Sequence, residues 1–201
     1  MMSKTHIAIG IAASLAVLQP QAASACLPVV LGGAIGGLLS DVDVRATARS
    51  RDAMQGRAID AALSVGLLAC DWVTGGQIRG YFLAHLGPQQ VVGALALLGL
   101  GALGMLSAHR TFTHSLLGLA LFGGALWLVC PPVVPAFAVG FISHVVLDML
   151  NKTPVRVLFP ARPGFCLGLC RADGHANDAL LVVGILATGA LLGVRLLALP
   201  A

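Results

Sequence analysis

Residues 144–148 read His-Val-Val-Leu-Asp and lie inside an apolar run from Val133 to Leu150. A histidine and an aspartate four positions apart share one face of a helix. Ionisable side chains inside a membrane segment are costly, and they mark functional sites unless they only pair with each other within a bundle. Taken alone, this stretch fits a functional site and a structural His–Asp pair equally well.

The composition of the whole chain is typical of an integral membrane protein. Of its 201 residues, 58% are hydrophobic and 10% are charged, with a mean hydropathy of +0.93, whereas soluble domains carry roughly 25% charged residues. We therefore predict an all-α, polytopic membrane bundle of about five to seven helices, forming one domain over residues 1–201. Its basic residues lie in short loops between apolar runs, so we expect contact with membrane lipids and no nucleic-acid partner.

Apolar runs separated by turn-forming residues predict the individual helices. The first two are too short to cross a ~30 Å hydrocarbon core alone, and glycines in the second predict that they pack closely as a hairpin. We expect Thr113 to cap the helix that starts at His114, and we expect residues 75–90 to form a loop. The predicted helices cover residues 6–18, 28–40, 58–73, 91–108, 114–130, 134–150 and 178–199.

The N-terminus resembles a secretory signal peptide. Lys4 precedes the apolar run Ile7–Leu18, and the small residues at 22–25 precede Cys26. Cleavage there would remove His6. We predict that the segment is retained, because His6 belongs with the other ionisable residues of the candidate site.

Alternation of helix direction brings those residues to one side of the membrane. The start of the first helix, the end of the second, the junction after residue 108 and the end of the 134–150 helix all fall on that side. All but Arg79 and Arg195 of the twelve Lys and Arg residues lie there too, so the positive-inside rule predicts that this side is cytoplasmic. The candidate metal ligands at these places are His6, Asp41, Asp43, His109, His114, His144 and Asp148.

This mixture of imidazoles and carboxylates indicates a divalent transition metal. It suits Zn²⁺ best, with Mn²⁺ or Fe²⁺ as alternatives, and suits Ca²⁺ and Mg²⁺ less because they prefer oxygen ligands. The candidates outnumber the ligands of one four-coordinate ion. We therefore expect either two ions about 3.5–4 Å apart or one ion whose histidines are oriented by outer carboxylates.

Three motifs resemble those of the YdjM-like, LexA-regulated inner-membrane proteins. Residues 38–43 (LLSDVD) resemble that family's LLPDID, residues 109–115 (HRTFTHS) resemble its HRGxTHS, and residues 140–150 (GFISHVVLDML) resemble its GxxSHxxxDML. His6 matches an N-terminal histidine of the family. The resemblance implies a helical membrane protein regarded as a metal-dependent hydrolase, with a loose likeness to zinc-dependent phospholipase C.

The chain departs from the family pattern at three positions. Ser40 replaces a proline, Val44 replaces a frequent histidine and Thr111 replaces a glycine. A further element, residues 174–178, matches only loosely. The histidine missing at position 44 implies either one ligand fewer or weakened chemistry on the same scaffold.

The first functional hypothesis is a hydrolase of the inner membrane that acts on a small-molecule or lipid substrate, lipid-like or phosphoester, at the cytoplasmic leaflet. Asp43 or Asp148 would act as general base, and Arg110 would hold a phosphate or carboxylate. The alternatives are a metal or proton transporter and a non-catalytic protein with a structural metal site. Only Asp71 and His85 lie toward the other side, which favours an enzyme or a structural site over a transporter.

Overall fold

The structure is a computed structural model that describes residues 2–43, 65, 69, 72–73, 75–84, 86–172 and 174–198. These residues are helical, with turns and loops between the helices and no strand among them. The prediction of an all-α bundle is therefore confirmed. Several predictions lie outside the described residues, namely most of the 58–73 helix, Val44, the basic segment 45–57, Asp71 and His85.

The helices follow the apolar runs closely. Three segments are long and apolar enough to cross a membrane, Pro88–Leu106, Pro131–Met149 and His175–Arg195, whereas the first two helices are shorter, as predicted. The described helices are α1 (Ser3–Leu18), α2 (Ala23–Leu39), α5 (Gln77–Ala84), α6 (Pro88–Leu106), α7 (Leu116–Val129), α8 (Val134–Met149) and α9 (His175–Ala198), with 3-10 turns at Phe112–His114 and Pro131–Val133.

Two local predictions were wrong. The stretch expected to be a loop at 75–90 contains α5, because the residues between the two glycine-bearing breaks are enough for two helical turns. Thr113 does not cap α7: its hydroxyl donates to Asp43. Ser115 is the N-cap instead, and its hydroxyl accepts from the backbone N–H of Gly118 at 3.0 Å.

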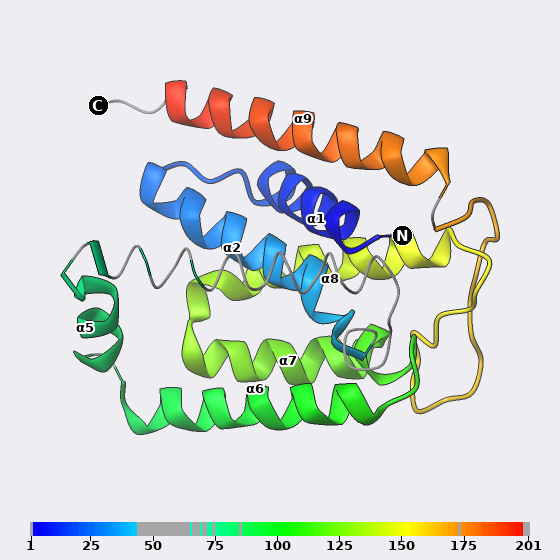
Figure 1. The fold of residues 1–201 in the computed structure, drawn as a ribbon, viewed down its shortest axis with the longest axis horizontal. Helices are drawn as coiled ribbons and strands as arrows, with labels where there is room; N and C mark the ends of the chain where they lie inside the picture. The colour runs from blue at the N-terminus through cyan, green and yellow to red at the C-terminus, as the bar shows by residue number, and fades with distance from the viewer. Residues whose placement is uncertain are drawn as a thin grey trace.

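The first two helices pack against α8 with their backbones in contact. α2 lies beside both α1 and α8, and α9 covers the outer side of α1 (Figure 1). A Cβ atom on Gly140 would lie 2.4 Å from the carbonyl oxygen of Gly33, and one on Gly37 would lie 2.4 Å from that of His6. The predicted close hairpin of α1 and α2 is thus confirmed, and it brings the start of α1 against the end of α2.

An apolar core lies behind the polar end of this group. Phe137 and Phe141 on α8 are buried against Phe122 on α7, together with Phe112 from the turn before α7. Val155, from the loop after α8, completes the cluster. Because Phe112 is anchored there, the turn that carries His109 and His114 is fixed against the end of α8.

Candidate metal centre

The structure brings together all seven histidine and aspartate residues singled out from the sequence. They come from the start of α1, the end of α2, the turn before α7 and the last turns of α8. All except His109, whose side chain is 43% exposed, are buried. Three overlapping groups have ligand atoms close enough to share an ion: His6, His144 and Asp148; Asp41, His114 and His144; and Asp43, His109 and His114.

Four of these atoms form the centre of the cluster. The Nε2 atoms of His114 and His144 are 3.2 Å apart. Asp41 Oδ1 lies 3.8 and 3.5 Å from these two nitrogens, and Asp148 Oδ2 lies 3.4 and 3.9 Å from them. Ligands of a tetrahedral Zn²⁺ with bonds of ~2.0–2.1 Å are separated by about 3.3 Å. The observed distances fit such a shell.

The hydrogen bonds of the two histidines indicate which nitrogens carry a lone pair. Nδ1 of His144 can only donate to the Gly37 carbonyl oxygen, at 2.8 Å. The Thr113 hydroxyl donates to Asp43 Oδ2 at 2.8 Å, and it therefore accepts from His114 Nδ1 at 3.0 Å. In the neutral rings both Nε2 atoms then present lone pairs to each other. Two facing lone pairs repel unless a cation lies between them.

The charges buried at this end also fit a divalent cation. Among the described residues, the charged side chains buried here are the carboxylates of Asp41, Asp43 and Asp148 and the guanidinium of Arg110. Burial raises the pKa of Asp41, but the neighbouring His144, His6 and His114 outweigh it, so the pKa lies below its ordinary value. With neutral histidines the buried set carries two excess negative charges, and buried charges are normally paired or bound to metals.

His6 lies at the edge of the central four atoms. Its side chain is fully buried, and neither ring nitrogen has a hydrogen-bond partner. Its ring stacks on His144 with centroids 3.7 Å apart, and its Nε2 lies 3.4 Å from Asp148 Oδ1. Since Asp148 offers Oδ1 to His6 and Oδ2 to the central histidines, the arrangement fits one ion with an added ligand or two ions sharing Asp148.

Asp43 has a different environment from the other carboxylates. Its Oδ1 pairs with His109 Nδ1 at 3.0 Å, and its Oδ2 accepts from the Arg110 backbone N–H at 3.2 Å and from the Thr113 hydroxyl. His114 Nδ1 is 3.6 Å from the same oxygen. Asp43 therefore contacts the far sides of two histidine rings, where carboxylates commonly orient metal-binding imidazoles.

Arg110 contacts Asp148 rather than an open cavity. Its Nε lies 3.2 Å from Asp148 Oδ2, an ion pair without hydrogen-bond alignment, and its Nη1 donates to the Thr153 carbonyl at 2.9 Å. The residue has φ +63, and its backbone is held by Asp43 and by the Arg156 N–H. A left-handed non-glycine residue costs roughly 1–2 kcal/mol, so these contacts maintain a strained backbone at the site.

Several partners of the cluster were not singled out from the sequence. The Ser3 hydroxyl donates to Asp41 Oδ2 at 3.1 Å, and the Asn151 amide donates to Asp148 Oδ1 at 3.1 Å. Asn151 follows Asp148 by three positions, a spacing that helical periodicity could have flagged. Ser3 and Thr113 carried no such signal. By contrast His175 and Asp178, in the loosely matching element, are exposed at the start of α9 and belong to none of the three groups.

Comparison with known proteins agrees with this arrangement. The chain matches the family model described as YdjM inner membrane protein over residues 1–200. It is also 29% identical over 79 residues to the uncharacterized protein YvsG of Bacillus subtilis (strain 168), a match that covers 38% of this chain and 49% of YvsG. The chain thus spans about half the length of this curated relative. No solved structure matches it. The chain belongs to the YdjM inner membrane protein family.

Proposed function

We propose that this YdjM-family protein is a membrane-bound metal-dependent hydrolase acting on a lipid-like or phosphoester substrate. The single observation that carries the proposal is the pair of His114 and His144 Nε2 atoms, 3.2 Å apart and flanked by two carboxylates. His114, His144, Asp41 and Asp148 would hold the ion, with His6 as a further ligand or as part of a second site. Zn²⁺ suits this ligand set best, and Mn²⁺ or Fe²⁺ are the alternatives.

A metal held there would lower the pKa of a bound water and polarise the scissile ester. The chain's own residues supply the proton transfer. His109 is the exposed member of the cluster, and Asp43 pairs with its Nδ1, so Asp43 orients the ring and leaves Nε2 as the proton acceptor at the mouth of the site. Asp43 thus acts through His109 rather than by contact with water.

Hydrolysis then proceeds with a balanced exchange of bonds. The oxygen of water bonds to the phosphorus or carbonyl carbon of the ester, and His109 takes the proton that this water loses. The bond from that atom to the leaving oxygen breaks, and the leaving group receives a proton from the same histidine. Arg110 keeps Asp148 in place through its ion pair, and its unassigned Nη2 is the group that would contact a substrate anion.

We place the site at the cytoplasmic face of the inner membrane. Most basic residues of the described chain are at the site end, while Arg195 is near the end of α9, a partition that follows the positive-inside rule. Two native cysteines can test this orientation, because Cys130 and Cys166 are exposed at opposite ends of the bundle. In single-cysteine variants, an impermeant maleimide added outside the cell should label Cys130 and spare Cys166. The reverse pattern would put the site outside.

A transporter is the less favoured alternative. Among the described residues, the buried ionisable groups all lie at the end of the bundle formed by His6, the 41–43 turn and the end of α8. The middle of the bundle holds a buried serine, Ser14, which donates to the Ala136 carbonyl at 3.0 Å. An ion path needs polar groups through the membrane depth, and this end-weighted distribution favours a hydrolase or a structural metal site.

The test of the hydrolase is metal-dependent release of product. Full-length protein, reconstituted in vesicles made from a total bacterial phospholipid extract, should release fatty acids or water-soluble phosphoesters. A chelator should stop the release and added Zn²⁺ should restore it. His109→Ala should retain its metal and lose the activity. Protein that carries metal yet releases neither kind of product from the extract would favour the structural metal site.

A further inference from the structure

We infer that the substrate is a membrane lipid and that one of its acyl chains enters the site sideways, from the bilayer, through a slot between α7 and α8. This inference rests on the proposed hydrolase, whose substrate class it narrows. It comes from a second cavity that adjoins the metal centre and is not itself part of the ligand set.

The slot is a small cavity of about 160 Å³. Leu116 and Leu119 of α7 form one side, and Ile142 and Val146 of α8 form the other. Val157, from the loop after α8, lies at the end near the metal centre, where its carbonyl accepts from the Leu116 N–H at 2.9 Å. Apart from His114 and Ser115, all the lining residues are apolar.

The slot opens toward lipid. Leu116, Ile142 and Val146 line it while being 54%, 50% and 51% exposed. In a membrane protein such half-exposed apolar side chains contact acyl chains rather than water. Phe141, also in the lining, is 1% exposed and forms part of the floor. The cavity is therefore continuous with the surrounding hydrocarbon on one side and closed by the core on the other.

His114 connects the slot with the metal centre. Its ring lines the slot, while its Nε2 is one of the four central ligand atoms. The same ring packs edge to face with that of His109, with centroids 5.2 Å apart. A hydrocarbon chain in the slot would thus lie one imidazole away from the candidate ion and close to the proposed proton acceptor. The ester of a lipid is the group joined to the near end of such a chain.

The dimensions select one acyl chain as the occupant. Cavities that enclose whole small molecules measure about 300–1,000 Å³, so a slot of about 160 Å³ accepts only part of one chain. The apolar lining would leave the polar groups of a headgroup without partners. We therefore expect recognition of the methylenes nearest the ester, and little dependence on the far end of the chain.

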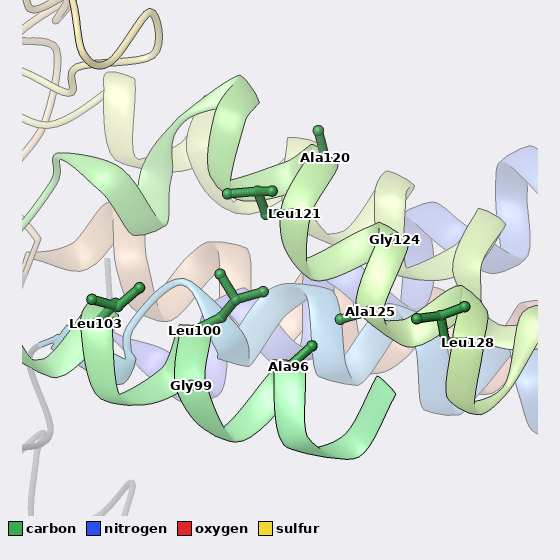
Figure 2. A pocket seen from close by; sticks show the side chains of 9 residues that line it. All are labelled: Ala96, Gly99, Leu100, Leu103, Ala120, Leu121, Gly124, Ala125 and Leu128. Atoms are coloured by element: carbon green, nitrogen blue, oxygen red, sulfur yellow. The ribbon is translucent and has the colours of Figure 1, made fainter. Parts of the chain in front are cut away.

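A second apolar hollow gives the contrast that this inference needs. It lies between α6 and α7, measures about 500 Å³ and is lined by leucines and small residues that include Gly99 and Gly124 (Figure 2). No residue of the metal cluster lines it. Lipid held there would be adjacent to no reactive group. The larger hollow therefore serves as the matched control for the smaller slot.

The test is photocrosslinking of full-length, metal-loaded protein in detergent, with a phosphatidylglycerol that carries a diazirine near the carbonyl of one acyl chain. We expect saturable labelling that maps to Leu119, Ile142 and Val146. Val146→Trp should fill the slot and weaken the saturable labelling about tenfold or more, since each methylene kept out of an apolar site costs about fourfold in affinity. Ile142→Trp should act in the same way, and Gly124→Leu, in the other hollow, should leave the labelling unchanged.

Metal content is measured on the same samples, so the two proposals can fail separately. Labelling that spreads evenly over the exposed helices and ignores both tryptophan variants, in protein with full metal content, would overturn the slot and leave the hydrolase standing. Protein without metal would overturn the proposed hydrolase whatever its labelling. Loss of metal in a tryptophan variant would mark that variant as misfolded, and the decision would then rest on the other one.

Discussion

The α2–α8 contact and the α6–α7 contact use glycine for opposite purposes. Between α2 and α8, a Cβ on Gly36 or Gly140 would lie within 2.4 Å of a carbonyl oxygen of the facing helix. Between α6 and α7, a Cβ on Gly99 or Gly124 would meet nothing within 4 Å, and the two helices leave the hollow shown in Figure 2. The tight contact ends at Asp41 and His144, whereas the loose one carries no ligand.

The difference indicates where precise packing matters in this bundle. Ligand atoms must be held within about 0.5 Å of a working geometry, and touching backbones hold the end of α2 rigidly against α8. The α6–α7 pair faces lipid, where an imperfect contact can be filled by acyl chains. Each prediction below either breaks the tight contact and its site or shows that the loose one tolerates the same change.

The largest effect is expected from removing a central ligand. His144→Ala and His114→Ala should each lower metal affinity by more than the roughly 10–100-fold that loss of an outer partner costs. His175→Ala is the matched control, because His175 is exposed and outside the cluster. Metal content after dialysis against a weak chelator measures the effect. Full occupancy in both ligand variants would reduce the cluster to hydrogen-bonding residues at helix ends.

The next effect tests the packing contrast with one substitution at two places. Gly140→Ala should lower the free energy of unfolding by about 1–3 kcal/mol, because the new methyl group overlaps the backbone of Gly33. Gly124→Ala should leave stability unchanged or slightly raised, since alanine favours the helix. Thermal unfolding in the same detergent compares them. Equal losses in the two variants would show that α6 and α7 pack as tightly as α2 and α8.

The smallest effect is expected at Asp43. Asp43→Asn keeps an acceptor oxygen but loses the charge that orients His109 and His114, so metal affinity should fall by about tenfold, at the low end for an outer partner. Hydrolysis should fall further, because the amide supports His109 poorly as a proton acceptor. Asp178→Asn, on the exposed start of α9, is the control. If Asp43→Asn empties the site, Asp43 is itself a ligand.

The sequence predicted which residues gather but not how they divide the work. Alternating helix direction was enough to bring His6, Asp41 and Asp148 to one end, because that argument needs only the order of apolar runs. It could not separate the four central atoms from Asp43 and His109, since that distinction depends on side-chain distances of an ångström or less. Nor could it show that Arg110 pairs with Asp148.

The local errors have equally definite causes. Glycines at 75–76 and 87 were interpreted as a loop, although the residues between them are sufficient for α5. Thr113 was assigned to a cap because hydroxyl residues favour that position. Its hydroxyl instead bonds Asp43, a residue 70 positions away in the chain. A tertiary contact of this kind has no local sequence signal.

The central claim is that the buried His/Asp cluster binds a transition metal, and elemental analysis of the purified protein tests it most directly. Full-length protein purified in detergent without chelators should contain about one to two equivalents of zinc, manganese or iron per chain, because binding offsets the charge buried at the site. Less than about half an equivalent of any transition metal, in protein that remains folded and accepts none on incubation with Zn²⁺, would contradict the account.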